Sequence, residues 1–371
     1  MIIGVPKEIK NNEYRVSMVP ASVLELVNSG HTLLVETQAG VGIGFTDQDY
    51  TNAGAEIIDT AAAVFAKADM IVKVKEPQAI ERAMLKPNQI LFTYLHLAPD
   101  LAQTQDLINS HAICIAYETV TDDKGGLPLL APMSAVAGRM AIQAGAQALE
   151  KSNAGRGMLL GGVPGVEPAK VVIIGGGIVG NHAAQMAVGM GADVTVLDKN
   201  HTVLHQLDSQ FGNKIKTLYS THDTITAQVT TADLVIGGVL IPGAAAPKLV
   251  TKAHIKMMKP GSAIVDVAID QGGCIATSKP TTHAEPCFII DDVVHYCVAN
   301  MPGAVPRTST FALNNSTLPY IMAIANKGYK RALADDKHLL NGLNIYNGHV
   351  TCESVAKNLN FNYLPPEVAI G

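Results

Sequence analysis

The stretch Val171-Val-Ile-Ile-Gly-Gly-Gly-Ile-Val-Gly180 decides the fold of this chain. Its first four residues are β-branched and uncharged, which is typical of a central strand in a parallel sheet. Glycines follow with the spacing G-x-G-x-x-G, and the alanine- and methionine-rich segment after them is predicted to be a helix. This order of strand, glycine turn and helix predicts a dinucleotide-binding unit.

Each position in the turn has a separate physical reason. Gly175 permits the tight turn, Gly177 lets the backbone approach a pyrophosphate, and Gly180 lets the helix lie close to the strand. The free N–H groups and the dipole at the helix N-terminus favour an anion. The next predicted strand ends at Asp198, about 20 residues after the first glycine, where its carboxylate would bind ribose hydroxyls and repel a 2′-phosphate. The motif therefore favours NAD over NADP.

Strand and helix patterns alternate on both sides of this motif. One series runs from residue 2 to residue 117 and a second runs from residue 170 to residue 267, which predicts parallel sheets wrapped by helices. Beyond Pro306 the pattern is helical, with no further strand and helix repeat. We therefore expect an α/β chain of two doubly wound Rossmann-like domains with an active-site cleft between them. The substrate domain is predicted at 1–128 plus 307–371, and the NAD domain at 129–306.

Composition excludes several other classes of protein. Charged residues make up 16% of the 371 residues, the formal net charge is −5, and lysine and arginine are scattered, so nucleic acid is not an expected partner. The apolar N-terminus is too short for a signal peptide, and the longest uncharged stretch is broken by glycines and polar residues, so neither secretion nor a membrane span is expected. Five cysteines without a C-x-x-C pair fit reduced thiols in the cytoplasm.

Polar residues stand where the predicted strands of the first series end. Arg15 follows the first strand, Lys75 follows 70–74 and His96 follows 90–95. Because the carboxyl ends of parallel strands share one edge, these side chains can converge on a ligand there. Asp270 stands in the corresponding place after the strand 263–267 of the second series.

Two other patterns are interpreted as structural. The glycines at 40–44 lack the dinucleotide spacing and are interpreted as a loop. His201, His205 and Asp208 could place metal ligands on one helix face, but a further ligand is not apparent, so they are interpreted as surface residues and no metal is expected.

The sequence resembles the alanine dehydrogenase/pyridine-nucleotide transhydrogenase family over nearly its whole length. The resemblance rests on these stretches: Ile3–Val16, Val74–Pro77, Thr93–His96, Val239–Gly243, Asp266–Gly273 and Val298–Ser309. It implies an enzyme that uses NAD to deaminate L-alanine to pyruvate and ammonium, and that runs in reverse. It also implies a homohexamer.

The resemblance further implies roles for individual residues. Arg15 and Lys75 would bind the substrate, and His96 and Asp270 would be catalytic. Family members often carry a basic residue where Val203 stands, and some carry an arginine where Lys279 stands. The resemblance and the motif together give these cofactor contacts: Ser134, Gly175, Gly177, Ile178, Val179, Gly180, Asp198, Ser220, Val239, Leu240, Val267, Ala268, Ile269, Asp270, Val298, Ala299, Asn300 and Met301.

Two alternatives stay open on the sequence. One is the soluble nucleotide-binding part of a transhydrogenase, which would need a membrane partner. The other is a protein that binds NAD or a keto acid without turnover, because a fold does not fix a function. The presence of Arg15, Lys75, His96 and Asp270 together argues against the second alternative.

The low proportion of charged residues suggests that part of the surface is hidden between subunits.

Overall fold

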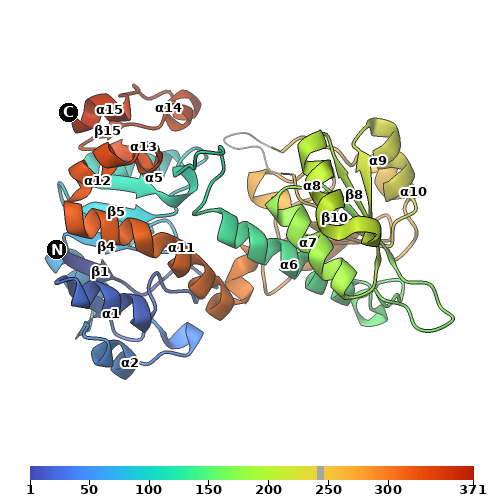
Figure 1. Cartoon of the computed structure of the whole chain (residues 1–371), viewed down its shortest axis with the longest axis horizontal. Helices are drawn as coiled ribbons and strands as arrows, with labels where there is room; N and C mark the ends of the chain where they lie inside the picture. Colours follow the sequence, from blue (N-terminus) through green and yellow to red (C-terminus); the bar gives the residue numbers. More distant parts are fainter. Residues whose placement is uncertain (240–245) are drawn as a thin grey trace. The chain divides into compact units, whose positions relative to one another are not determined.

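The computed structural model describes residues 1–239 and 246–371, which form two compact units. The first unit comprises Met1–Met133 and Val305–Gly371, and the second comprises Ser134–Ala304. Figure 1 shows the first unit built from blue to cyan and orange to red segments of the chain. The chain passes into the second unit within α6 (Ala131–Ala148) and returns just before α11 (Pro306–Lys327).

The first unit is built around a mixed sheet with the strand order β15-β14-β6-β5-β4-β1-β2-β3. Strands β1 to β6 pair in parallel, whereas β14 pairs antiparallel with both β6 and β15. Its strands are β1 (Ile2–Val5), β2 (Thr32–Glu36), β3 (Glu56–Ile58), β4 (Met70–Val72), β5 (Ile90–Thr93), β6 (Ile113–Ala116), β14 (Leu343–Tyr346) and β15 (His349–Val350). Its helices, besides α11, are α1 (Pro20–Asn28), α2 (Asp47–Asn52), α3 (Ala61–Lys67), α4 (Ala79–Arg82), α5 (Leu101–Ser110), α12 (Tyr329–Asp335), α13 (Lys337–Leu340), α14 (Glu353–Leu359) and α15 (Pro366–Ile370).

Strands β14 and β15 correct the expectation that the chain beyond Pro306 is helical. They form a hairpin through Asn347 and Gly348, whose φ angles are 46° and 89°. An Asn-Gly pair with positive φ at both residues is the preferred two-residue hairpin turn, so the sequence did hold a signal for these strands. The strands are short and lie among helices, which conceals their alternation.

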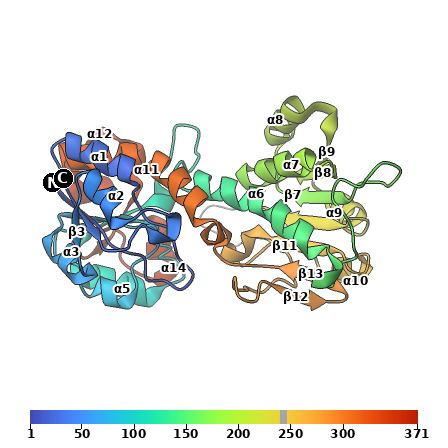
Figure 2. The same ribbon diagram turned by 90° about the horizontal axis from the view of Figure 1, so that it is seen from below.

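The second unit is built around a sheet with the strand order β12-β13-β11-β10-β7-β8-β9. All neighbours pair in parallel except β12, which pairs antiparallel with β13 at the edge seen in Figure 2. Its strands are β7 (Lys170–Ile174), β8 (Asp193–Asp198), β9 (Ile215–Tyr219), β10 (Leu234–Gly237), β11 (Ala263–Asp266), β12 (Cys287–Ile290) and β13 (Val293–Tyr296). Its helices, besides most of α6, are α7 (Ile178–Gly189), α8 (His201–Phe211), α9 (His222–Val229) and α10 (Lys252–Met257).

Strand β7 explains why its sequence is uniformly apolar. Val171 and Ile173 belong to one buried cluster together with alanines of α6 and α7. Val172 and Ile174 belong to a second cluster on the opposite face, with side chains of α9 and α10. A strand covered on both faces needs apolar residues at every position rather than alternation.

The predicted α/β class with two mostly parallel sheets is therefore confirmed. The strand order also reverses between β7 and β10, as in dinucleotide-binding folds. Among the described residues, no helix is long and apolar enough to cross a membrane.

Candidate active site

The glycine turn after β7 has the geometry that a dinucleotide cradle requires. Gly175 has a φ of 97°, which an L-side chain rarely adopts. A Cβ on Gly180 would lie 1.8 Å from the carbonyl oxygen of Gly175, so α7 approaches the turn more closely than any side chain permits. A Cβ on Gly177 would have no atom within 4 Å, and Gly177 is exposed at the N-cap of α7. The open space at Gly177 fits the close approach of a pyrophosphate.

Asp198 ties this turn to the next strand and helix. Its Oδ2 accepts a hydrogen bond from the N–H of Gly176 at 2.6 Å, and its Oδ1 accepts one from the N–H of Asn200 at 2.8 Å. The carboxylate is half-buried and keeps further lone pairs, since each oxygen has two. Beside it, the rings of His201 and Tyr219 stack with centroids 5.0 Å apart. Asp198 therefore fixes the turn and can still accept bonds from a ribose.

The remaining predicted cofactor residues of the second unit also follow strand ends. Ser220 follows β9, Val239 follows β10, the segment 267–270 follows β11 and the segment 298–301 follows β13. Ser134 lies in α6. Leu240 lies outside the described residues. The turns after the parallel strands share one edge of the sheet, where dinucleotides bind in this fold.

Asp270 lies on a short 3₁₀ helix, η5 (Val267–Gln271), and is exposed. The fully buried carboxylate of Asp266 holds the chain that follows this helix, because it accepts hydrogen bonds from the N–H groups of Cys274 at 3.3 Å and Ile275 at 3.1 Å. The turn is thus anchored at the strand end, and Asp270 projects from an anchored segment.

In the first unit, Arg15 is buried and held by Glu13. Its Nε donates to Oε1 of Glu13 at 2.6 Å and its Nη2 donates to Oε2 at 2.5 Å, a two-point ion pair. Its Nη1 lies 3.1 Å from the sulfur of Met133. Burial would lower the pKa of Arg15, but the hydrogen bonds and charge of Glu13 outweigh it, so the pKa is raised above its ordinary value. The guanidinium therefore stays charged and oriented.

Lys75 lies three residues beyond β4 and is half-buried. Its N–H donates to Glu8 at 3.2 Å, and its carbonyl accepts a hydrogen bond from the hydroxyl of Thr93 at 3.0 Å. Burial would raise the pKa of the neighbouring Glu76, but the charges of Lys75 and Lys10 lower it overall. The hydrogen bonds of its N–H and of its carbonyl fix the backbone of Lys75 on both sides.

His96 has a backbone conformation that is unusual for a residue other than glycine, with a φ of 51°. The carboxylate of Glu118 accepts hydrogen bonds from the N–H groups of His96 at 2.6 Å and Leu95 at 3.1 Å. The imidazole is about half exposed and stacks on Tyr94 with centroids 5.8 Å apart and planes 7° apart. Left-handed residues held by such bonds occur often at functional sites.

These three residues follow β1, β4 and β5, which are neighbours in the sheet. The structure therefore brings Arg15, Lys75 and His96 to one sheet edge. Glu13 and Glu118, which hold two of them, were not predicted from the sequence. Glu13 stands two residues before Arg15, and this short separation is the available signal, whereas Glu118 meets His96 only through the tertiary fold.

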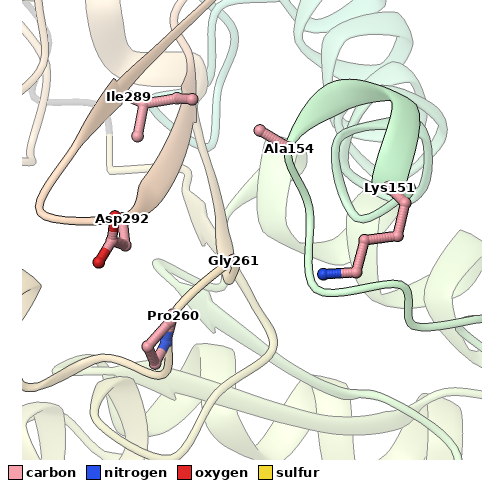
Figure 3. A pocket seen from close by; sticks show the side chains of 6 residues that line it. All are labelled: Lys151, Ala154, Pro260, Gly261, Ile289 and Asp292. Carbon is pink, nitrogen blue, oxygen red and sulfur yellow. The ribbon is translucent and has the colours of Figure 1, made fainter.

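Other features of the described residues lie outside the predicted site. No group of three potential metal ligands is found among residues 1–239 and 246–371. The glycines at 40–44 form a loop around a short 3₁₀ helix, η1 (Val41–Ile43). A pocket of about 260 Å³ lies before the amino end of β11 and is shown in Figure 3. Its lining comprises Lys151, Ala154, Pro260, Gly261, Ile289 and Asp292, which do not belong to the predicted site.

A glycine turn typical of dinucleotide-binding folds in one unit, and a buried arginine, a lysine and a histidine on the sheet edge of the other unit, are features that the class of dinucleotide-dependent oxidoreductases would need. Comparisons with known proteins agree. Residues 4–137 match the N-terminal domain, and residues 141–353 the C-terminal domain, of the alanine dehydrogenase/PNT family. The chain belongs to this family.

Full-length relatives support the assignment. The alanine dehydrogenase of Halomonas elongata is 57% identical over 371 residues, which is 100% of both chains. A solved structure named L-alanine dehydrogenase has a TM-score of 0.94 and 51% identity, and the match covers 97% of this chain and 99% of that one. A transhydrogenase structure from Sinorhizobium meliloti shares the fold, with a TM-score of 0.81 and 23% identity over 95% of this chain and 100% of that one.

Proposed function

We propose that this chain catalyses the reversible, NAD-dependent oxidative deamination of L-alanine to pyruvate and ammonium. The observation that carries the proposal is the buried Arg15, oriented by Glu13, on the same sheet edge as Lys75 and His96. A charged guanidinium fixed in this way recognises a carboxylate, which L-alanine and pyruvate share. The full-length identity to named alanine dehydrogenases supports the same substrate.

In this proposal Arg15 and Lys75 bind the substrate. The guanidinium of Arg15 donates to the substrate carboxylate, and its ion pair with Glu13 prevents it from turning away. The ammonium of Lys75 donates to the carboxylate or polarises the carbonyl of pyruvate. The guanidinium of Arg15, held by Glu13, and the ammonium of Lys75, on a fixed backbone, would together hold the Cα in one orientation that suits the reaction.

NAD would lie on the glycine turn and Asp198, and when bound it supplies the acceptor for the hydride that leaves the Cα of the substrate. The open space at Gly177 and the carboxylate at Asp198 fit a pyrophosphate and an unphosphorylated ribose. Ser134, Ser220 and Val239, with the segments 267–270 and 298–301, are proposed as further contacts.

His96 and Asp270 would manage the protons. Loss of a proton from the ammonium group of L-alanine and of a hydride from its Cα leaves a cationic iminium. Water attacks the iminium and gives up a proton to form a carbinolamine, which collapses to pyruvate and ammonia. An imidazole can both accept and donate a proton through its ring nitrogens, so His96 is suited to take a proton from the attacking water and return one to the leaving amine. Asp270 is suited to stabilise the cationic iminium and amine.

NADH formation with L-alanine, measured beside glycine, L-serine and L-lysine under the same conditions, tests this function. We expect the highest kcat/KM with L-alanine. Absence of NADH formation with every amino acid would refute the enzyme, and a higher value with another amino acid would refute the substrate.

We further propose a homohexamer that works in the cytoplasm. The family resemblance supports it, and a chain with 16% charged residues carries little charge for a fully solvated surface. Sedimentation velocity at micromolar concentration should show the hexamer, and a stable monomer would refute the proposal.

A further inference from the structure

Three charged side chains, those of Glu8, Lys73 and Glu81, lie buried together next to the segment of Lys75. The ammonium of Lys73 is fully buried and lies 2.9 Å from Oε2 of Glu8 and 2.7 Å from Oε1 of Glu81. The two carboxylates are 3% and 1% exposed. Burial would lower the pKa of Lys73, but the two carboxylates raise it above its ordinary value, so the ammonium stays charged.

Glu8 connects this cluster to the substrate-binding edge. While its Oε2 faces Lys73, its Oε1 accepts hydrogen bonds from the N–H groups of Val74 at 2.7 Å and Lys75 at 3.2 Å. Glu81 is held in turn, because its Oε2 accepts the N–H of Gln78 at 2.7 Å as part of the cap of α4. In each carboxylate, therefore, one oxygen faces the ammonium of Lys73 and the other accepts hydrogen bonds from backbone N–H groups.

Stability by itself does not explain this arrangement. Three buried charges incur a desolvation cost that their attraction only partly offsets, and apolar residues of similar volume often serve as well. Burial raises the pKa of Glu8 above its ordinary value despite the charge of Lys73, a cost that a purely cohesive contact would not need. The cluster does provide a rigid acceptor, Glu8, for the backbone N–H of Lys75. On the other side of Lys75, its carbonyl accepts a hydrogen bond from the Thr93 hydroxyl.

We propose that Glu8, locked in place by Lys73 and Glu81, is a positioning residue that sets where the Lys75 ammonium meets the substrate. This inference rests on the proposed function, because it needs Lys75 to bind the keto acid or amino acid. Glu8 acts through the backbone of Lys75 and does not itself touch the substrate.

Glu8→Gln tests the proposal with little change of volume. If the oxygen of the new amide keeps accepting from the backbone, its NH₂ group faces the ammonium of Lys73. Two donors then face each other where the wild-type carboxylate accepts a hydrogen bond. If the amide turns, the backbone N–H groups lose their acceptor. In both cases we expect KM for pyruvate to rise about tenfold or more, whereas the Kd of NADH, measured by its fluorescence, stays within twofold.

A double-mutant cycle with Lys75→Ala distinguishes positioning from general loosening. If Glu8 acts through Lys75, Glu8→Gln should lower kcat/KM about tenfold in the wild-type background and less than twofold in the Lys75→Ala background. Equal losses in the two backgrounds would overturn the proposal. So would a wild-type KM in folded Glu8→Gln.

Glu36→Gln is the matched control. Glu36 is the last residue of β2 in this sheet, and like Glu8 it accepts hydrogen bonds from backbone N–H groups, here those of Lys7 at 2.7 Å and of Ala61. It shares the electrostatic influence of Lys73 with Glu8, but these hydrogen bonds hold segments other than that of Lys75. We expect kcat/KM within twofold of wild type, and a loss equal to that of Glu8→Gln would overturn the specific role.

Hydrogen exchange gives a readout apart from activity. In Glu8→Gln, the amides of Val74 and Lys75 should exchange at least tenfold faster, while those of the glycine turn of the second unit stay unchanged. If Glu8→Gln does not fold, Glu8→Asp keeps the charge but shortens the reach, and the same KM and exchange results are expected. Unchanged exchange in a folded variant would overturn the proposal.

Failure of the proposed function has a different signature. A wild-type chain without amino-acid-dependent NADH formation refutes the function, and the positioning role falls with it. An active wild type with equal losses in the two backgrounds refutes the positioning role alone.

Discussion

Three glycines, Gly177 at the N-cap of α7 and Gly180 and Gly189 within it, should have three different effects when each is replaced by alanine. A Cβ at Gly180 would lie 1.8 Å from the oxygen of Gly175, whereas ordinary contact begins at 3.4 Å. The helix and the turn would therefore have to separate by more than about 1 Å, at the upper end of overpacking costs, or about 3 kcal/mol. For a unit of this size that corresponds to a fall of about 6–12 °C in Tm.

Gly177→Ala should instead leave stability nearly intact and reduce cofactor affinity. Its added Cβ meets no atom within 4 Å, and the φ of −65° suits any L-residue. The Tm without cofactor should fall by no more than about 3 °C, because alanine costs about 0.5–1 kcal/mol more than glycine at an N-cap. The methyl group enters the space proposed for the pyrophosphate, so the Kd of NADH should rise about tenfold or more.

Gly189→Ala is the control, because its added Cβ also meets no atom within 4 Å and it lies at the other end of the helix. It should raise stability by about 0.5 kcal/mol by restricting the unfolded chain and should leave the Kd unchanged. Thermal unfolding without cofactor and NADH fluorescence titration measure both quantities. A wild-type Tm in Gly180→Ala would refute the packing argument, and a wild-type Kd in Gly177→Ala would refute the phosphate site.

Further predictions concern selectivity, turnover and pH. Asp198→Ala should raise the ratio of kcat/KM with NADP to that with NAD at least tenfold, and an unaltered ratio would refute its ribose role. His96→Ala should lower kcat at least about 100-fold and leave the Kd of NADH within twofold of wild type. Glu118→Gln should lower kcat about tenfold, because the carboxylate that accepts the N–H of His96 loses its charge. Wild-type turnover in either variant would remove that residue from the mechanism. Burial lowers the pKa of His295, so its contribution to stability is present above its unfolded pKa of about 6.5 and is lost as pH falls through the folded value. The Tm of wild type should therefore fall more between pH 7.5 and pH 5.5 than that of His295→Gln, and parallel curves would contradict this.

The fold could be predicted from the sequence because local and global signals agree in β7 and its turn. A strand buried on both faces must be apolar throughout, and glycines with this spacing between a strand and a helix are typical of dinucleotide-binding turns. The hairpin of β14 and β15 escaped prediction because strands of four and two residues among helices have too little periodicity. Asn347 and Gly348 were its available sign.

The candidate site was predictable for residues that follow strand ends, such as Lys75 and His96. Their partners were not, because Glu8 and Glu118 reach them across strands far apart in the sequence. The φ of His96 is also set by tertiary hydrogen bonds, and nothing in a Leu-His-Leu segment indicates a left-handed residue.

The pairing of β6 with β14 has a consequence for how the protein is made. Roughly 230 residues separate the two strands, including the whole second unit, so β6 leaves the ribosome long before its partner. At roughly 5–20 residues per second, the delay is about 10–50 s. During that time the apolar edge of Ile113–Ala116 is open to pairing with another chain. The second unit is continuous and can fold in the interval, so slowing synthesis after residue 304 should increase aggregation of the first unit more than misfolding of the second.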